Sequence, residues 1–273
     1  MIQDIGPHRF DNSFKKKEPE ASDFLLYYEK NELFLEKEGE ELCLPRLSLI
    51  PEHAWGQGKY LFSIDDAGFY LFSEMPEPLP GLLNRCSVQS MRDMKENWMG
   101  FAGATGWQLS RWESAHRFCS RCGGPMENSL TERALVCPAC GLTEYPKISP
   151  AVIVAVSDGD RLLMIRGKNS APGRYHLVAG YVEIGETFEQ TVAREVLEEV
   201  GIRVKNIRYY KSQPWAFSDT VMVGFTAELE GQDGFTLQEN EIAEAKWVFH
   251  REIPENTSNA SIGSELINLF RKG

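Results

Sequence analysis

The chain has 273 residues, and 42% of them are hydrophobic, which is enough to bury the core of one large domain or of two smaller ones. A disordered or fibrous protein is therefore excluded. The formal net charge of -11 repels a polyphosphate backbone at long range, so a general nucleic-acid coat protein is not expected. No stretch approaches the roughly 18 to 20 apolar residues of a membrane span, and the N-terminal sequence lacks the apolar block of a secretory signal. We therefore expect a soluble, cytoplasmic protein with no membrane partner.

The first part of the chain, residues 1–116, is expected to form a β-rich domain. Apolar runs on either side of short polar turns are typical of β-hairpins, and two such pairs occur. The four runs are residues 23–28, 32–36, 59–64 and 69–74. Residues 88–116 carry Met and Trp among polar residues, which predicts two short helices broken near Gly103–Gly106.

The next segment, residues 117–145, contains two C-x2-C pairs separated by fourteen residues. They are Cys119 with Cys122 and Cys137 with Cys140. Four thiolates from two such turns complete the tetrahedral shell of a structural Zn²⁺ and leave no position open for water. A thioredoxin-like redox site needs only one pair, so zinc is the favoured interpretation. A zinc ribbon alone would suggest nucleic-acid binding, which the acidic balance of the chain disfavours as the main function.

The last part, residues 146–273, alternates strand-like and helix-like patterns and predicts an α/β (α+β) domain with helices on the faces of a mixed sheet. The predicted strands are residues 151–156, 161–166, 207–212, 221–229 and 246–249. A helix is predicted over residues 187–200, ended by Gly201, and another over residues 261–271.

The first of these helices is acidic on one side. Phe188, Val192, Val196 and Val200 recur every four residues and predict the face that packs on the core, with Leu197 beside it. Glu195, Glu198 and Glu199 fall within an arc of about 100° at the edge of that face. Grouped carboxylates on a rigid helix are the hard ligands that Mg²⁺ or Mn²⁺ prefers, with the remaining positions left to water and substrate phosphates. A solvated acidic face is the alternative interpretation.

Two further features of this stretch concern its loop. Arg194 lies eight residues after Glu186, and a contact between them would fix the loop against the helix. Gly180 and Gly185 would let the loop turn sharply and approach a ligand closely.

Written out, the stretch is Gly180, five residues, Glu186, seven residues, and then Arg194-Glu195-Val196-Leu197-Glu198-Glu199-Val200-Gly201-Ile202. It resembles the Nudix box, G-x5-E-x7-R-E-U-x-E-E-x-G-U, at every fixed position. The resemblance implies an α/β/α sandwich that uses divalent metals to hydrolyse a nucleoside diphosphate linked to another group. It also implies that Glu195, Glu198 and Glu199 are metal ligands and that Glu186 supports them through Arg194.

A second motif, residues 212–220, reads SQPWAFSDT. An aromatic pair near a proline also suits a core or an interface. Together with the four cysteines, however, the motif resembles the NADH pyrophosphatase branch of the Nudix family, whose signature is S-Q-P-W-P-F-P-x-S. Ala216 and Ser218 replace prolines of that signature, and Thr220 replaces a serine. The implied substrate-binding residues are Gln213, Pro214, Trp215, Ala216, Phe217, Ser218, Asp219 and Thr220.

Other site residues follow from the same resemblance alone. Further substrate contacts are implied for Tyr145, Tyr181, Gly263, Glu132, Arg92 and Arg46. The backbone carbonyl of Ala179 and the side chain of Glu241 are implied as further ligands of the catalytic Mg²⁺ or Mn²⁺.

The resemblance implies hydrolysis of NADH and NAD⁺ to nicotinamide mononucleotide and AMP, removal of NAD caps from RNA, and a homodimer. Two alternatives remain open at this point. The altered signature allows another diphosphate substrate, such as ADP-ribose or a diadenosine polyphosphate. A nucleotide- or RNA-binding regulator with a retired active site would be favoured by the loss of a box glutamate, and none is lost.

Overall fold

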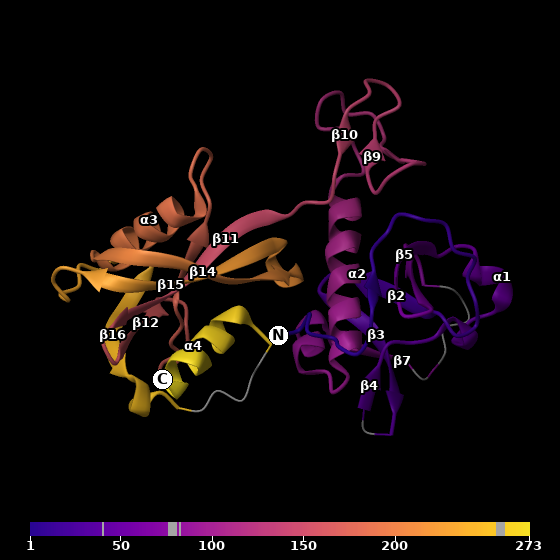
Figure 1. The fold of residues 1–273 in the computed structure, drawn as a ribbon. Coiled ribbons are helices and arrows are strands. Elements are labelled where there is room, and N and C mark those ends of the chain that lie inside the picture. Colours follow the sequence, from indigo (N-terminus) through magenta and orange to yellow (C-terminus); the bar gives the residue numbers. More distant parts are fainter. Residues whose placement is uncertain (40, 76–80, 82, 255–259) are drawn as a thin grey trace. The chain divides into compact units, whose positions relative to one another are not determined.

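The computed structural model describes residues 1–39, 41–75, 81, 83–254 and 260–273 (Figure 1). The chain divides into two compact units. The N-terminal unit comprises residues 2–147, and the C-terminal unit comprises Met1 and residues 148–273. Within the described ranges, no helix is long and apolar enough to cross a membrane.

The N-terminal unit is built on a seven-stranded sheet among its described residues. In its described residues the strands run in the order β1-β5-β6-β2-β3-β4, with β7 paired to β3. Both predicted hairpins are present, as β2 with β3 and β5 with β6. The strands are β1 (Phe10–Asp11), β2 (Phe24–Glu29), β3 (Glu32–Glu38), β4 (Glu41–Cys43), β5 (Lys59–Ile64), β6 (Ala67–Phe72) and β7 (Leu83–Ser87). The short helices are η1 (Leu47–Leu49), α1 (Glu52–Trp55) and η2 (Val88–Asp93).

The predicted break near Gly103–Gly106 is wrong, because α2 (Asn97–Ala115) runs through it without interruption. The glycines allow close packing instead of ending the helix. A Cβ at Gly103 would lie 2.5 Å from the Met91 sulfur, and one at Gly106 would lie 2.5 Å from Leu26 Cδ1. The hydroxyl of Tyr28 donates to the Gly103 carbonyl at 2.7 Å across the same contact. Glycine lowers the stability of a helix, and the close packing of α2 against the sheet therefore offsets this loss of stability.

The cysteine segment forms a small sheet of its own, in the order β10-β9-β8. Each strand has two residues: β8 (Glu127–Asn128), β9 (Leu135–Val136) and β10 (Thr143–Glu144). Cys119, Cys137, Ala134 and Leu135 are its buried apolar residues among those described. This core is too small to hold the segment folded without a cross-link or a metal.

The C-terminal unit is built on a mixed sheet. Among its described residues the order is β14-β15-β11-β12-β16, with β13 paired to β11. The β11 and β15 strands are parallel, and the other pairs are antiparallel. The elements are β11 (Ser149–Asp158), β12 (Arg161–Gly167), β13 (Val178–Tyr181), α3 (Phe188–Val200), β14 (Arg203–Trp215), η3 (Ala216–Ser218), β15 (Thr220–Glu230), β16 (Ile242–Phe249), η4 (His250–Glu252) and α4 (Ile262–Lys272).

Helices cover both faces of this sheet. Val152, Val154 and Val156 of β11 pack with Val192, Val196 and Val200 of α3. On the other face, Ala155 of β11 and Met222 of β15 pack with Ile262 and Leu266 of α4. Alternate residues of β11 therefore face opposite helices, as the two-residue period of a strand requires. The predicted α/β class with a mixed sheet between helices is confirmed.

The predicted core stripe of α3 is wrong at Phe188 and at Leu197. Val192, Val196 and Val200 are completely buried, whereas Phe188 is 39% exposed and Leu197 is 49% exposed. A spacing of four residues advances about 40° around a helix, so Phe188 lies about 120° from Val200 and leaves the core.

Candidate active site

The acidic helix α3 is fixed at both ends by its own sequence. Thr187 is its N-cap, and its hydroxyl accepts a hydrogen bond from the Gln190 amide while the Gln190 side chain accepts one from the Thr187 amide. Gly201 ends the helix with a left-handed φ of 74°. These caps satisfy backbone N–H and C=O groups that have no partner within the helix. They therefore fix where α3 begins and ends, and with it the positions of its glutamates.

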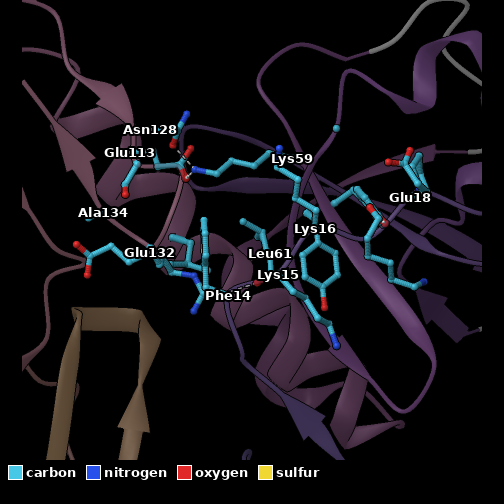
Figure 2. A pocket seen from close by; sticks show the side chains of 18 of the residues that line it. Phe14, Lys15, Lys16, Glu18, Lys59, Leu61, Glu113, Asn128, Glu132 and Ala134 are labelled. Carbon is cyan, nitrogen blue, oxygen red and sulfur yellow. Dashed lines mark hydrogen bonds and ion pairs between the residues drawn. The ribbon is translucent and has the colours of Figure 1, made fainter. Parts of the chain in front are cut away.

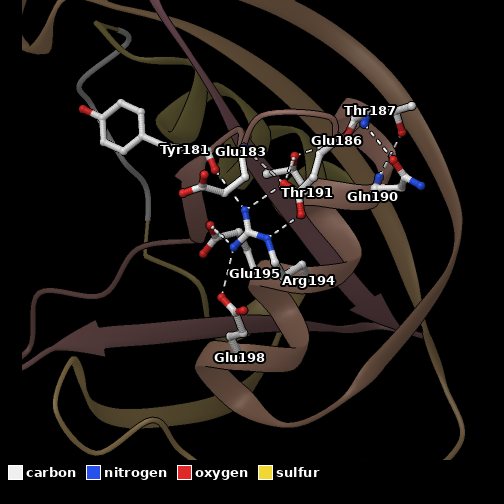
Figure 3. A network of polar contacts seen from close by, with 9 residues as sticks. All are labelled: Tyr181, Glu183, Glu186, Thr187, Gln190, Thr191, Arg194, Glu195 and Glu198. Carbon is white, nitrogen blue, oxygen red and sulfur yellow. Dashed lines mark hydrogen bonds and ion pairs between the residues drawn. The ribbon is translucent and has the colours of Figure 1, made fainter.

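Arg194 is the centre of the polar network at this helix (Figure 3). Its guanidinium donates to both carboxylate oxygens of Glu186, at 2.6 and 2.9 Å. It also donates to Glu195 at 2.7 Å, to Glu198 at 3.0 Å and to the Tyr181 carbonyl at 3.0 Å. The predicted contact between Arg194 and Glu186 is confirmed. A planar guanidinium can hold several carboxylates in one geometry, so Arg194 joins the loop to the helix.

Glu186 is held as an anion by its neighbours. The hydrogen bonds from Arg194 are the main reason why the pKa of Glu186 is lowered to about 2, although burial acts in the opposite direction. The Thr191 hydroxyl donates to the same carboxylate at 2.9 Å, and Thr191 is completely buried. Sequence reasoning missed Thr191, although a hydroxyl on the buried face of α3, five residues after Glu186, was a usable signal.

The structure explains the glycine at position 180 by close packing and not by the predicted sharp turn. It lies in β13, opposite Val152, and its φ is not left-handed. A Cβ at this position would lie 2.0 Å from Cδ of Glu195. The Glu195 carboxylate therefore occupies the space that any other side chain would fill. Gly185, in contrast, has a φ of 92°, which fits the prediction that it bends the loop.

We expect Gly180→Ala to preserve the fold and to weaken the binding of a divalent metal at these carboxylates, so that a higher Mg²⁺ concentration is needed. The added methyl meets the mobile end of the Glu195 side chain, which can rotate away but then leaves its position. Mutating the groups that only orient a metal's ligands typically costs about 10- to 100-fold in metal affinity or activity, and moving a ligand itself is expected to cost at least as much. The Mg²⁺ concentration for half-maximal turnover and the Tm would be measured together. Gly234→Ala is the control, because a Cβ there has nothing within 4 Å. An unchanged Mg²⁺ concentration for half-maximal turnover would contradict the prediction that Glu195 is a metal ligand.

Glu199 is the most unusual carboxylate of the group. Its side chain is buried, with 8% exposed, and Oε2 has no hydrogen-bond partner within the described part of the chain. Burial, and then the charges of Glu195, Glu241 and Glu198, raise the pKa of Glu199 to about 8. Burial also raises the pKa of Glu195. A buried carboxylate among like charges is stabilised by a cation, so these residues fit a divalent metal.

The carboxylates are neighbours without converging on one point. Among the described residues, the one group of three or more metal-ligating side chains whose ligand atoms come close together is that of Cys119, Cys122, Cys137 and Cys140, within 4.8 Å of one another. Arg194 holds Glu195 and Glu198, and the charge of Glu241 acts on Glu199 from the residue before β16. Ala179 lies in β13 next to Gly180. The structure therefore brings the predicted ligands to one region around Glu199.

Two of the predicted substrate-binding residues of the C-terminal unit, Tyr181 and Gln213, lie in one row of the sheet. Tyr181 pairs with Ala151, Ala151 with Met222, and Met222 with Gln213. Paired residues point to the same face, and here it is the face that α4 covers. Tyr181 is 51% exposed, and Figure 3 shows its ring turned away from the carboxylates.

The signature segment continues from this row. Pro214 and Trp215 end β14, Ala216, Phe217 and Ser218 form η3, Asp219 has a left-handed φ of 54°, and Thr220 begins β15. The rings of Trp215 and Phe217 contact each other with centroids 4.9 Å apart. The hydroxyls of Ser218 and Thr220 are 2.9 Å apart. Gln213 differs from the rest, because its side chain is completely buried and bonded to the start of α4.

Four predicted substrate contacts belong to the N-terminal unit. The Tyr145 hydroxyl donates to Glu132 at 3.2 Å, and the Tyr145 ring is 58% exposed. Arg46 stacks over Phe24 at 4.6 Å and donates to the Ser22 carbonyl at 2.6 Å. Arg92 lies in η2 and contacts Gln89 at 3.5 Å. The contacts of Arg46 are those of a residue that packs on the sheet.

The N-terminal unit also contains a cavity of about 420 Å³, which Glu132 helps to line (Figure 2). Its lining is rich in lysine, but three of those lysines have carboxylate partners. Lys15 pairs with Asp11, Lys17 with Asp23, and Lys59 with Glu113. Figure 2 shows Lys59 directed at Glu113 and Asn128.

The cysteine cluster has the geometry of a structural metal site. The sulfurs of Cys119 and Cys140 are 3.5 Å apart, as are those of Cys122 and Cys137. The Arg121 amide donates to the Cys119 sulfur at 3.4 Å, which favours the thiolate that a metal needs. The four residues fit a tetrahedral Zn²⁺ with no open position.

Two family models match segments of this chain. The NUDIX domain model matches residues 147–270, and the NADH pyrophosphatase zinc ribbon domain model matches residues 114–145. The chain is 40% identical over 219 residues to the NAD-capped RNA hydrolase NudC of Stutzerimonas stutzeri, with 80% of this chain and 75% of that protein covered. It is 38% identical over 238 residues to the protein of the same name from Pseudomonas aeruginosa, with 85% and 81% covered.

Among solved structures, a NUDIX hydrolase from Nitrosomonas europaea matches 57% of this chain and 90% of that chain, with a TM-score of 0.49 and 26% identity. The family assignment follows from the two domain models and from the length over which the relatives align. The chain belongs to the Nudix hydrolases, in the NudC family that carries a zinc ribbon before its Nudix domain.

Proposed function

We propose that the protein hydrolyses the diphosphate bond of NADH and NAD⁺, giving nicotinamide mononucleotide and AMP, and removes NAD caps from RNA by the same cleavage. The observation that carries the proposal is the buried carboxylate of Glu199, whose Oε2 has no hydrogen-bond partner among the residues that the structure describes. It lies among Glu195, Glu198 and Glu241, in a chain of the NudC family. A diphosphate substrate is anionic and repels such a group unless a cation lies between them.

Mg²⁺ or Mn²⁺ is proposed as that cation. Glu195, Glu198, Glu199, Glu241 and the carbonyl of Ala179 would hold it. When bound, such an ion neutralises diphosphate charge and lowers the pKa of coordinated water for in-line attack on phosphorus. Arg194 and Glu186 keep the helix and the loop in register, so that the carboxylates face the substrate from a rigid support.

The nicotinamide ring of the substrate is proposed to lie on the face of the sheet that Tyr181 shares with the signature segment. Tyr181 and the Trp215–Phe217 pair offer exposed or half-buried aromatic surface for stacking. The remaining proposed substrate contacts are Tyr145, Glu132, Gly263, Arg46, Arg92, Pro214 and residues 216–220. We also propose a cytoplasmic homodimer with domains at residues 1–116, 117–145 and 146–273.

Product analysis tests the proposal directly. The purified protein would be incubated with Mg²⁺ or Mn²⁺ and, side by side, NADH, NAD⁺, ADP-ribose and a diadenosine polyphosphate. We expect NADH or NAD⁺ to be cleaved fastest, to nicotinamide mononucleotide and AMP. Ala216 and Ser218 remove two prolines of the family signature, so the same assay reports whether the loop tolerates their loss. Preference for another diphosphate would keep the Nudix chemistry and overturn the NAD assignment.

A further inference from the structure

Gln213 makes contacts that a substrate-facing side chain would not make. Its side chain is 0% exposed. Nε2 donates to the carbonyl of Ala260 at 2.9 Å, and Oε1 accepts from the amide of Ile262 at 2.8 Å. One amide group thus bonds a backbone acceptor and a backbone donor on either side of Ser261. Ser261 is the N-cap of α4, and its hydroxyl accepts from the Ser264 amide at 3.2 Å.

Close packing against the sheet also holds the start of α4 in place. Ile262 is buried, and a Cβ at Gly224 of β15 would lie 2.5 Å from Ile262 Cδ1. A Cβ at Gly263 would lie 2.9 Å from Cδ1 of Ile153 in β11. The first turn of α4 therefore sits directly on the sheet, and Gln213 supplies polar bonds at the edge of this apolar contact.

The strand register connects this contact with the proposed substrate surface. Gln213, Met222, Ala151 and Tyr181 form one row across four strands and face the same way. Gly263 belongs to the helix turn above that face, and Trp215 follows Gln213 by two residues on the same side of β14. Gln213 thus ties two segments proposed to contact the substrate, residues 214–220 and the first turn of α4, to each other.

We infer that Gln213 is a positioning residue of the substrate-binding surface, which holds the first turn of α4 in register with the signature segment and thereby sets the fit of the nicotinamide ring of the substrate. This inference rests on the proposed function. Gln213 itself does not touch the substrate. Its replacement is therefore expected to impair binding of a substrate that carries the ring, while the phosphate chemistry at Glu199 is spared.

The test is Gln213→Met, which keeps the length and packing of the side chain and removes both hydrogen bonds. KM and kcat would be measured for NADH and for ADP-ribose, which shares the adenosine diphosphate part and lacks the nicotinamide ring. We expect KM for NADH to rise about tenfold, as two lost hydrogen bonds allow, with KM for ADP-ribose and both kcat values within about twofold. Gln232→Met, at an exposed position, is the matched control.

Hydrogen exchange gives a readout that does not depend on the substrate. In Gln213→Met the Ile262 amide should exchange faster than in the parent protein, because its acceptor is gone. Unchanged exchange there, or equal KM changes for both substrates, would overturn the inference. If the parent protein hydrolyses no NAD compound, the proposed function fails while the exchange result still decides whether Gln213 holds α4.

A measurement on the parent protein covers the case in which Gln213→Met does not fold. Saturating nicotinamide mononucleotide should slow exchange of the amides at residues 260–264, because this turn lines the proposed ring site. No protection there, with the mononucleotide shown to bind, would contradict the role of this turn in the substrate surface.

Discussion

Glu199→Gln is expected to abolish NADH hydrolysis, with a loss in kcat of about a thousandfold or more and an intact fold. The amide has the shape of the carboxylate but neither its charge nor its strength as a ligand for a hard cation. Glu199 is buried, its pKa is raised to about 8, and its Oε2 has no hydrogen-bond partner among the described residues, so its charge is tolerated only with a cation nearby. In metal-free buffer the variant should therefore be at least as stable as the parent.

The measurements are turnover at saturating Mg²⁺ and Tm with and without Mg²⁺. The parent should gain Tm on adding Mg²⁺, and Glu199→Gln should lose most of that gain. Glu189→Gln is the matched control, because Glu189 is an exposed glutamate in the first turn of the same helix. Normal turnover in Glu199→Gln would disprove the metal-site assignment. A large fall in metal-free Tm would instead indicate that Glu199 has a structural role.

Removal of zinc is expected to unfold residues 117–145 while the C-terminal unit stays folded. The three strands of this segment have two residues each, and the free energy of structural zinc binding, about 10–16 kcal/mol in zinc-finger peptides, far exceeds what so small a core supplies. Metal analysis should find one Zn²⁺ per chain in the parent protein. After chelation, hydrogen exchange should become fast over β8, β9 and β10 and remain slow in α3.

Cys137→Ser should reproduce the effect of the chelator, because Cys137 is completely buried within the cluster. Cys86→Ser is the control, since Cys86 lies in β7 outside the cluster. Slow exchange at β9 in zinc-free protein would show that the segment folds without its metal.

The features that the sequence determined by itself are local. The ends of α3 follow from Thr187, Gln190 and Gly201, because capping and left-handed termination involve residues within one turn of each other. The four cysteines meet because each pair lies in one tight turn and their ligand chemistry is unambiguous. The contact of Arg194 with Glu186 spans only a loop and two helical turns.

Only the tertiary structure decided the features that depend on distant segments. The sequence predicts a helix break at Gly103, and only the structure shows that this glycine lets α2 pack against Met91. The sequence likewise predicts a turn at Gly180, and only the structure shows that Glu195 lies beside this glycine of β13. Gln213 belongs to a substrate motif by sequence, and its bonds to Ala260 and Ile262 span more than forty residues. Close approach and burial are set by what folding brings opposite a residue, and no pattern of near neighbours contains that information.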